Sequence, residues 1–457
     1  MVIRIIVLIL YFAILLGIGV YTSKKAKSYA EYNLAARGNN KWIAGISTQS
    51  SSTSGWMLLA MPGLAFTYGF AAIWWLIGWM SGSLFNWIVL AKRLRIATES
   101  YDSVTVVEFF EKRTGDKKGL IGLVSGISII ILMTINSSGE LIGCGKLIQA
   151  AFGINFTTAV TIGLVIVVVY TFLGGYMAVS WSNLLQGALM FVALLLVPLY
   201  AIFHMGGFGV LAQNLASLDP EFFNFLHGTT DPVQIVVLVS GGLGIGFMYP
   251  GMVHALTGLI AIKDPQEIKD AGLIATIWGC AALGGASLIG FAGRALLSDI
   301  ADPEQTFLVL SETYFNNALF AVMAAAVMAA ILSSVCAYLI VATASLGGSV
   351  IKNFTKIEDE HKIVKIEKIS MVIIALLAFN GGSVHTVAMF AASGLGASFG
   401  PTVIASLYGN KINYKGAVAS ILTGLLVVIV WFYSGLSNYL FEVFPGWIAS
   451  TLALFLV

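Results

Sequence analysis

The chain has 457 residues, of which 58% are hydrophobic and only 10% are charged, and its mean hydropathy is +0.92. This composition excludes an ordinary soluble domain and indicates a polytopic protein of the lipid bilayer. The net charge of +2 gives no sign of nucleic-acid binding. The three cysteines (Cys144, Cys280 and Cys336) lie far apart in apolar segments, so we expect neither a disulfide nor a metal site among them.

Runs of about 20 apolar residues, the length that crosses a bilayer as a helix, recur along the chain. They predict about 13 membrane-spanning helices, at residues 3–21, 42–68, 70–91, 119–150, 155–175, 184–203, 233–261, 271–293, 318–346, 367–379, 383–407, 413–434 and 441–457. The first run could be mistaken for a secretory signal, but Val20-Tyr21-Thr22 is a poor cleavage site and the run is long. We expect it to remain as a helix of the mature protein.

The positions of the basic residues predict how the chain is oriented. If the N-terminus lies outside, 21 of the 24 lysines and arginines fall in inward loops, and only Arg4, Lys146 and Arg294 do not. Cytoplasmic loops are enriched in lysine and arginine. The sequence therefore predicts an all-α membrane protein with its N-terminus outside and its C-terminus inside.

The expected helix at 42–68 contains a polar run, Ser50-Ser51-Ser52-Thr53-Ser54-Gly55-Trp56. Backbone can leave the helical hydrogen-bond pattern at membrane depth only where protein or a water-filled cavity satisfies the freed N–H and C=O groups. This segment is therefore expected to line a binding site, as in transporters of small solutes.

A second interruption is expected in the helix at 233–261, at the glycine run 241–246, five helices after the first. Broken helices in corresponding positions of two halves are typical of inverted-repeat transporters, whose sites lie between the breaks. The alternative is that these glycines only allow close helix packing. No nucleotide-binding loop of the form G-x-x-x-x-G-K-[ST] is present, so transport would be secondary or passive and the chain is not expected to be an enzyme.

Several motifs resemble the sodium:solute symporter family, and most of all its sodium/proline symporter branch. They are Ser54-Gly55-Trp56-Met57-Leu58-Leu59-Ala60-Met61-Pro62-Gly63, Ala91-Lys92-Arg93-Leu94-Arg95, the stretch from Tyr170 to Trp181, Lys263-Asp264-Pro265 and Ala330-Ile331-Leu332-Ser333-Ser334. The resemblance covers nearly the whole chain, in order and in spacing. It also implies a prokaryotic-type inner or cell membrane.

The resemblance implies a LeuT-type fold of two inverted five-helix repeats. The expected parts are a peripheral helix with its cytoplasmic loop (1–41), a first repeat with an outer loop (42–232), a second repeat (233–410) and peripheral C-terminal helices (411–457).

The resemblance also implies a sodium site, formed by the backbone carbonyls of Ser50 and Thr53 and by the segment Ala330 to Ser334, with the hydroxyls of Ser333 and Ser334 as ligands. The alternative for two serines in a membrane helix is bonding of each hydroxyl to the preceding turn of its own helix.

Two acidic positions of the family are neutral in this chain. Ser52 stands where sodium/proline symporters have an aspartate, and Asn183 stands where they read Trp-Thr-Asp. Both residues remain candidates for the cation site. A buried cation without a negative charge nearby loses much of the compensation for its desolvation. We therefore expect sodium binding that is weaker than in the family, or absent.

Glu140 is an acid that the family resemblance does not explain. It lies within the expected helix at 119–150, with Asn136 one turn earlier on the same face. Acids at membrane depth are costly and usually face a cavity or a partner. Glu140 is expected to take up a proton or to hold a cationic group of the substrate; the alternative is a structural contact, for instance an ion pair with Lys146.

The expected substrate site contains Ser54, Gly55, Trp56, Asn136, Glu140 and Tyr249. Half-helix N-termini offer backbone N–H groups to anions, which favours a small solute with a carboxylate, such as the amino acid proline. Tyr249 is a candidate wall or hydrogen-bond donor of the pocket; the alternative is a packing residue, which aromatic residues in membrane helices more often are. His254, in the same segment, could titrate, but it is expected to be a satisfied packing residue.

Three functions remain open at this stage. The first is symport coupled to a cation, with sodium as the family default. The second keeps the fold but couples transport to a proton on Glu140, or to no ion. The third is the transporter-like module of a sensor. The expected partners are a small-molecule substrate, a coupling cation and the bilayer, with the chain as a monomer and without a cofactor other than that ion.

Overall fold

A computed structural model describes residues 2–457 apart from 298–299, 356, 358, 378–383 and 410–411. Its long helices are α1 (Val2–Ser23), α3 (Lys41–Leu58), α5 (Ile73–Phe85), α8 (Leu120–Phe152), α9 (Phe156–Met205), α11 (Pro232–Met248), α13 (Ile268–Leu296), α15 (Asn317–Ser345), α17 (Glu360–Leu377), α18 (Val384–Tyr408), α19 (Tyr414–Tyr433) and α20 (Val443–Leu456). The shorter helices are α2 (Tyr29–Leu34), α4 (Ala60–Tyr68), α6 (Ala91–Ser100), α7 (Val106–Thr114), α10 (Phe208–Leu218), α12 (Val253–Ile260), α14 (Thr306–Tyr314) and α16 (Lys352–Thr355). Throughout the described residues there is no strand, only an isolated bridge between Asn39 and Ile262.

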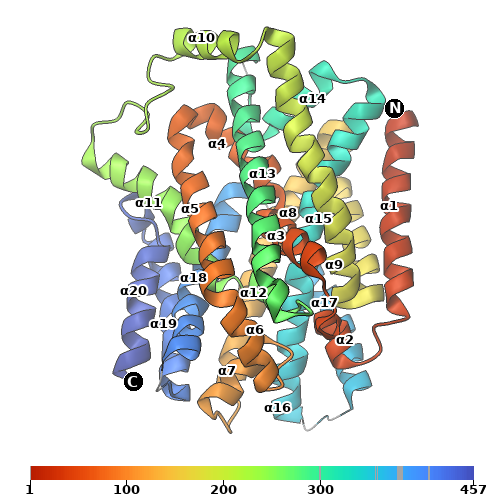
Figure 1. Ribbon diagram of the computed structural model, residues 1–457, viewed down its shortest axis with the longest axis vertical. Helices are drawn as coiled ribbons and strands as arrows, with labels where there is room; N and C mark the ends of the chain where they lie inside the picture. The colour runs from red at the N-terminus through yellow and green to blue at the C-terminus, as the bar shows by residue number, and fades with distance from the viewer. Residues whose placement is uncertain (1, 298–299, 356, 358, 378–383, 410–411) are drawn as a thin grey trace.

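The helices form one upright bundle with the two termini at opposite ends (Figure 1). Nine stretches of the described chain are long and apolar enough to cross a membrane. One of them, α9, contains both spans expected at 155–175 and 184–203, because it bends at Gly175, whose φ of 57° and ψ of −153° are not helical. The expected all-helical membrane fold is confirmed. The expected span 367–379 lies partly in α17 and partly in residues outside the described ranges.

The centre of the bundle is α15, which is packed against α8, α9 and α3. In the 18-residue apolar window of the stretch Asn317–Thr355, which contains α15, 89% of the residues are buried, against 17% in the corresponding window of α1. The outer helix α1 exposes a row of large apolar side chains, including Ile5, Ile9 and Val20. These positions make α15 the core helix and α1 a peripheral, lipid-facing helix.

Two spans are broken, and one break is not where the sequence indicates. In the first span, Ser54 interrupts α3 with a φ of 56° and a ψ of −173°. In the second, the chain leaves the helix between α11 and α12, over Tyr249–Gly251 and Met252. The prediction of a break at 241–246 is wrong, because those residues lie inside α11.

The physical reason is close packing. A Cβ on Gly242 would approach the Trp74 backbone to 2.5 Å, so this glycine lets α11 lie directly against α5. The break itself follows from Pro250, which has no N–H to donate to the preceding turn.

Candidate functional site

The break of α3 is held by a buried carboxylate from α8. Glu140 is fully buried, and its Oε2 accepts a hydrogen bond from the backbone N–H of Gly55 at 2.8 Å. The next N–H, of Trp56, donates to the hydroxyl of Ser54 at 3.2 Å. The dihedral angles of Ser54 belong to a region that non-glycine residues rarely adopt, and such strain gathers at ligand sites and switch regions.

The alternative of an ion pair between Glu140 and Lys146 is wrong. Lys146 Nζ instead contacts Asp302 at 3.0 Å and Glu304 at 2.6 Å. The other oxygen of Glu140, Oε1, has no hydrogen-bond partner among the described residues. Glu140 therefore belongs to the broken helix and not to that ion-pair cluster.

Two serines of α15 reach across to α3 just before its break. Ser333 Oγ lies 2.8 Å from the Ala330 carbonyl and 3.4 Å from that of Ser50. Ser334 Oγ lies 2.9 Å from the Ser51 carbonyl and 3.3 Å from that of Ala330. Each of the two hydroxyls therefore contacts both the preceding turn of its own helix and a carbonyl of α3. The Ser51 carbonyl is a group that the sequence analysis did not single out.

Asn183 of α9 closes this cluster from a third helix. Its backbone carbonyl accepts a hydrogen bond from Ser50 Oγ at 3.2 Å. Its side chain is 1% exposed, and Oδ1 has no partner in the described part of the chain. The hydroxyl of Thr53 donates to the Ser50 carbonyl at 2.9 Å. Carbonyls of unwound helices are the groups that coordinate alkali ions in transporters of this architecture, so the oxygen cluster fits such an ion.

Between the two broken spans lies a central pocket. Its lining includes Ser52, Ser54, Trp56, Asn136, Tyr249 and Tyr338. The enclosed volume is about 40 Å³, which has room for a few water molecules and not for an amino acid. Of the predicted substrate residues, Ser54, Trp56, Asn136 and Tyr249 line this pocket, while Gly55 and Glu140 bond to each other outside its lining.

Ser52 faces this pocket and not the oxygen cluster. It is half-buried, and its hydroxyl donates to the Thr48 carbonyl at 2.7 Å. It is therefore separated from Ser50, Ser333 and Ser334, with which it was grouped on the sequence evidence.

Two polar side chains from the second break also line the pocket without a partner. The Tyr249 hydroxyl is buried and has no hydrogen-bond partner among the described residues, and the same holds for both ring nitrogens of His254. The His254 ring packs edge-on against Tyr338, with the ring centres 4.8 Å apart. The expectation for His254 is therefore right about packing and wrong about hydrogen bonding: its neighbours give it van der Waals contact and, among the described residues, no hydrogen bond.

A larger cavity lies on the other side of Trp56. It encloses about 440 Å³, and its lining includes Tyr68, Trp75, Gln234, His385, Met389 and Asn438. Met389 borders both cavities. The indole N–H of Trp56 donates to His385 Nδ1 at 3.0 Å, so this pair stands between the two spaces. Sequence reasoning missed His385, which follows the expected short helix and has no motif around it.

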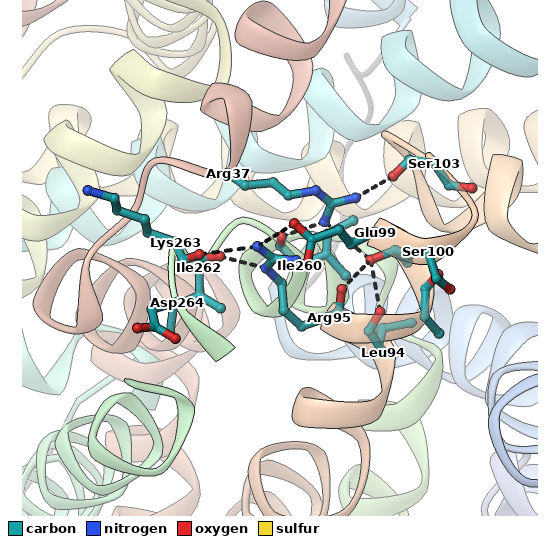
Figure 2. A network of polar contacts seen from close by, with 12 residues as sticks. Arg37, Leu94, Arg95, Glu99, Ser100, Ser103, Ile260, Ile262, Lys263 and Asp264 are labelled. Carbon is teal, nitrogen blue, oxygen red and sulfur yellow. Dashed lines mark hydrogen bonds and ion pairs between the residues drawn. The ribbon is translucent and has the colours of Figure 1, made fainter. Parts of the chain in front are cut away.

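Two arginines bind the chain at and just beyond the end of α12 (Figure 2). Arg95 is 3% exposed, and its guanidinium donates to the carbonyls of Ile262 at 2.7 Å and Lys263 at 3.1 Å. Arg37 donates to the carbonyls of Ile260 at 2.9 Å and Ser103 at 2.8 Å. Arg95 and Lys263 belong to the motifs 91–95 and 263–265, which the sequence analysis noted without giving them a role. Their contacts fasten the end of α12 to α6.

A family model describing the sodium:solute symporter family matches residues 32–424. The chain belongs to this family. Among curated proteins, it is 33% identical to the high-affinity proline transporter PutP of Bacillus subtilis, over 97% of this chain and 95% of the relative. It is 32% identical to the osmoregulated proline transporter OpuE of the same organism, over 97% and 92%.

Solved structures show the same fold. A Na+-coupled sialic acid symporter in a substrate-bound outward-open state aligns with a TM-score of 0.84 at 17% identity, over 99% of this chain and 97% of that one. MhsT in complex with L-phenylalanine aligns with a TM-score of 0.57 at 15% identity, over 90% and 97%. The predicted LeuT-type fold is thereby confirmed. Family and fold make the chain an integral membrane protein and a secondary active transporter, not an enzyme.

Proposed function

We propose that this chain moves a small organic solute inward by alternating access and couples that movement to sodium. One observation carries the proposal: the hydroxyls of Ser333 and Ser334 meet the carbonyls of Ser50 and Ser51 beside the central pocket. An ion bound there would join α15 to the broken α3, and so would link ion binding to the shape of the pocket.

The proposed ion site consists of Ser50, Thr53, Asn183, Ala330, Ser333 and Ser334, to which the Ser51 carbonyl is added. Ser52 is assigned to the solute pocket because it lines that space. The proposed solute site consists of Ser52, Ser54, Gly55, Trp56, Asn136, Glu140 and Tyr249. Relatives named as proline transporters make proline, and then small carboxylates, the first solutes to test.

The proposed organisation follows the two breaks. Segments 42–232 and 233–410 would be the inverted repeats, and 1–41 and 411–457 the peripheral parts. Support comes from the first break in α3 and the second between α11 and α12, each in the first span of its repeat. The chain is further proposed to act as a monomer in a prokaryotic-type inner or cell membrane.

A second candidate is coupling to protons, with Glu140 as the group that binds them. The observation that favours it is a fully buried carboxylate whose Oε1 has no hydrogen-bond partner among the described residues. At the two positions where an acid was expected, this chain has the neutral residues Ser52 and Asn183. Transport without a coupling ion, or a role as a sensor module, would share the fold. Neither has a structural observation of its own.

The test is uptake of labelled proline and a panel of small amino acids, carboxylates and amines into proteoliposomes, with sodium and proton gradients imposed separately. Accumulation driven by sodium is the expected result. In a second arm, Ser333→Ala with Ser334→Ala should raise the sodium concentration for half-maximal uptake by about tenfold or more, since two oxygen ligands are lost.

The matched control is Ser345→Ala. Ser345 is also buried on α15, but its hydroxyl bonds to the Val341 carbonyl of its own helix, at 2.8 Å. This variant should keep the wild-type sodium dependence. Accumulation driven by protons alone would select the second candidate, and equilibration under both gradients would contradict coupled transport.

A further inference from the structure

The polar groups at the break of α3 are already occupied by the protein. The first two free N–H groups of the outer half-helix belong to Gly55 and Trp56. The first donates to the Glu140 carboxylate at 2.8 Å and the second to the Ser54 hydroxyl at 3.2 Å. Glu140 has no exposed surface, so no water competes for this contact.

Such N–H groups have a known use in transporters with broken helices. The N-terminus of a half-helix carries the positive end of the helix dipole and binds the anionic group of a substrate. In this chain, a carboxylate from α8 takes that position. A solute carboxylate would have to displace Glu140 and leave a second charge buried without compensation, which is strongly unfavourable.

Within the described residues, the rest of the pocket supplies hydroxyl, amide and imidazole groups, but no fixed positive charge that would replace those N–H groups. Among the described residues that line it there is no lysine or arginine to bind a carboxylate. Its walls include four aromatic side chains: Trp56, Trp79, Tyr249 and Tyr338. Aromatic faces attract organic cations. The Tyr249 hydroxyl, which has no hydrogen-bond partner within the described part of the chain, can accept a hydrogen bond from an ammonium group.

We propose that Glu140 takes the place of a substrate carboxylate, so that the transported solute is an organic amine cation without a carboxylate group. This inference rests on the proposed function, because it takes the central pocket as the solute site. It narrows the solute class from small organic solutes to amine cations. It therefore excludes proline, the solute in the names of the relatives, because proline carries a carboxylate.

The experiment compares pairs of ligands that differ in the carboxylate. Pyrrolidine is compared with L-proline, and choline with glycine betaine, by equilibrium binding to the purified full chain in lipid nanodiscs without any gradient. The wild-type protein should bind the amine of at least one pair about tenfold or more tightly than its carboxylate partner, the factor expected for one unfavourable buried charge.

The Glu140 variants test the cause of this preference. Glu140→Gln should weaken amine binding about tenfold or more, since it removes the negative charge. Glu140→Ala frees the Gly55 N–H, so the preference should shift toward the carboxylate partner. Glu442→Gln is the matched control: Glu442 is another buried glutamate, held by Ser393 at 3.1 Å and Ser437 at 3.0 Å, outside the pocket lining. It should keep the wild-type preference.

Three results would overturn the inference: tighter binding of the carboxylate partners by the wild type, binding of no member of either pair, or an unchanged preference in Glu140→Gln. A carboxylate that bound at the uncapped start of α12 would produce the first of these. The comparison of amine and carboxylate binding by the wild-type protein tests the inference even if a Glu140 variant does not fold. Sodium-driven accumulation of a carboxylate solute would contradict this inference and leave the proposed function intact. Amine-selective binding without coupled accumulation would support this inference and contradict the proposed function.

Discussion

Single polar atoms in the core of this transporter serve two helices at once. Ser333 Oγ and Ser334 Oγ each lie within hydrogen-bond distance of a carbonyl of α15 and of one of α3. A serine in a membrane helix is often satisfied by its own preceding turn alone. Here the second contact joins the core helix to the broken helix, which would make these hydroxyls sensitive to any shift between the two.

In the short helix α7, Glu111 predicts a measurable pH dependence. Burial raises its pKa from the ordinary value of 4.5 to about 7, against the lowering effect of the hydrogen bond from Asn353. Between these two values the folded protein binds more protons than the unfolded chain. Stability should therefore fall as the pH rises through this window, by up to about 1.4 kcal/mol for each pH unit, and level off above it.

The measurement is the thermal unfolding temperature from about pH 5 to about pH 8, the range around that pKa. Glu111→Gln should flatten the fall relative to wild type and gain stability at the alkaline end. Glu221→Gln, which changes an exposed glutamate of the outer loop, should leave the wild-type slope. Parallel curves for wild type and Glu111→Gln would contradict the assignment.

At the scale of elements, the contact between α6 and the end of α12 depends on a guanidinium. Arg95 bonds to two carbonyls beyond α12 and also to Glu99, at 2.8 Å. The lysine side chain carries a single ammonium nitrogen and cannot bond to the carbonyls beyond α12 and to the Glu99 carboxylate at the same time. Arg95→Lys should therefore lower the free energy of unfolding by about 2–4 kcal/mol, since buried charge-assisted hydrogen bonds are lost.

Unfolding in a denaturant series measures this loss, and the labelling rate of a cysteine placed at Ile262 reports loosening of the contact between α6 and the end of α12. Both should change in Arg95→Lys. Lys92→Ala alters an exposed residue of the same motif and should change neither. An unfolding midpoint equal to wild type would mean that the arginine contacts are not needed to hold α6 to the end of α12.

The elements differ in how well the sequence predicts them. Hydropathy predicted that the chain is built of long apolar helices, because the bilayer forces them, but it gave about 13 spans where the described chain has nine candidates. The position of the second break was missed, since the glycines of α11 keep their helical hydrogen bonds and only Pro250 lacks an N–H. Local sequence pattern cannot distinguish a glycine that packs from one that breaks.

The candidate site shows the same division. Ser50, Ser333 and Ser334 were found through the family motifs, and the structure brings them together. The bond between Gly55 and Glu140 joins residues 85 positions apart, and no spacing rule indicates such a pair. His254 was misjudged because a partner can be counted only when the neighbouring helices are placed.

For the whole molecule, the orientation in the membrane remains a prediction. The termini lie at opposite ends of the bundle (Figure 1), as an odd number of crossings requires. In a cysteine-free background, a cysteine at Gln213 on α10 should react with a membrane-impermeant maleimide in intact cells. One at Lys117 should react only after the cells are opened. Both positions are exposed, so the reverse pattern would overturn the N-outside orientation.

The neutral oxygen cluster between α3, α9 and α15 has a consequence for the choice among alkali ions. A sodium ion there would meet carbonyl and hydroxyl dipoles and no carboxylate, so the electric field that strips its hydration shell would be weak. Discrimination against the larger, more easily dehydrated potassium ion would then depend on how firmly the helices fix the spacing of the oxygens. Selectivity would vary with conformation, being greatest while the contacts between α3 and α15 hold the oxygens in place and least as these helices move apart.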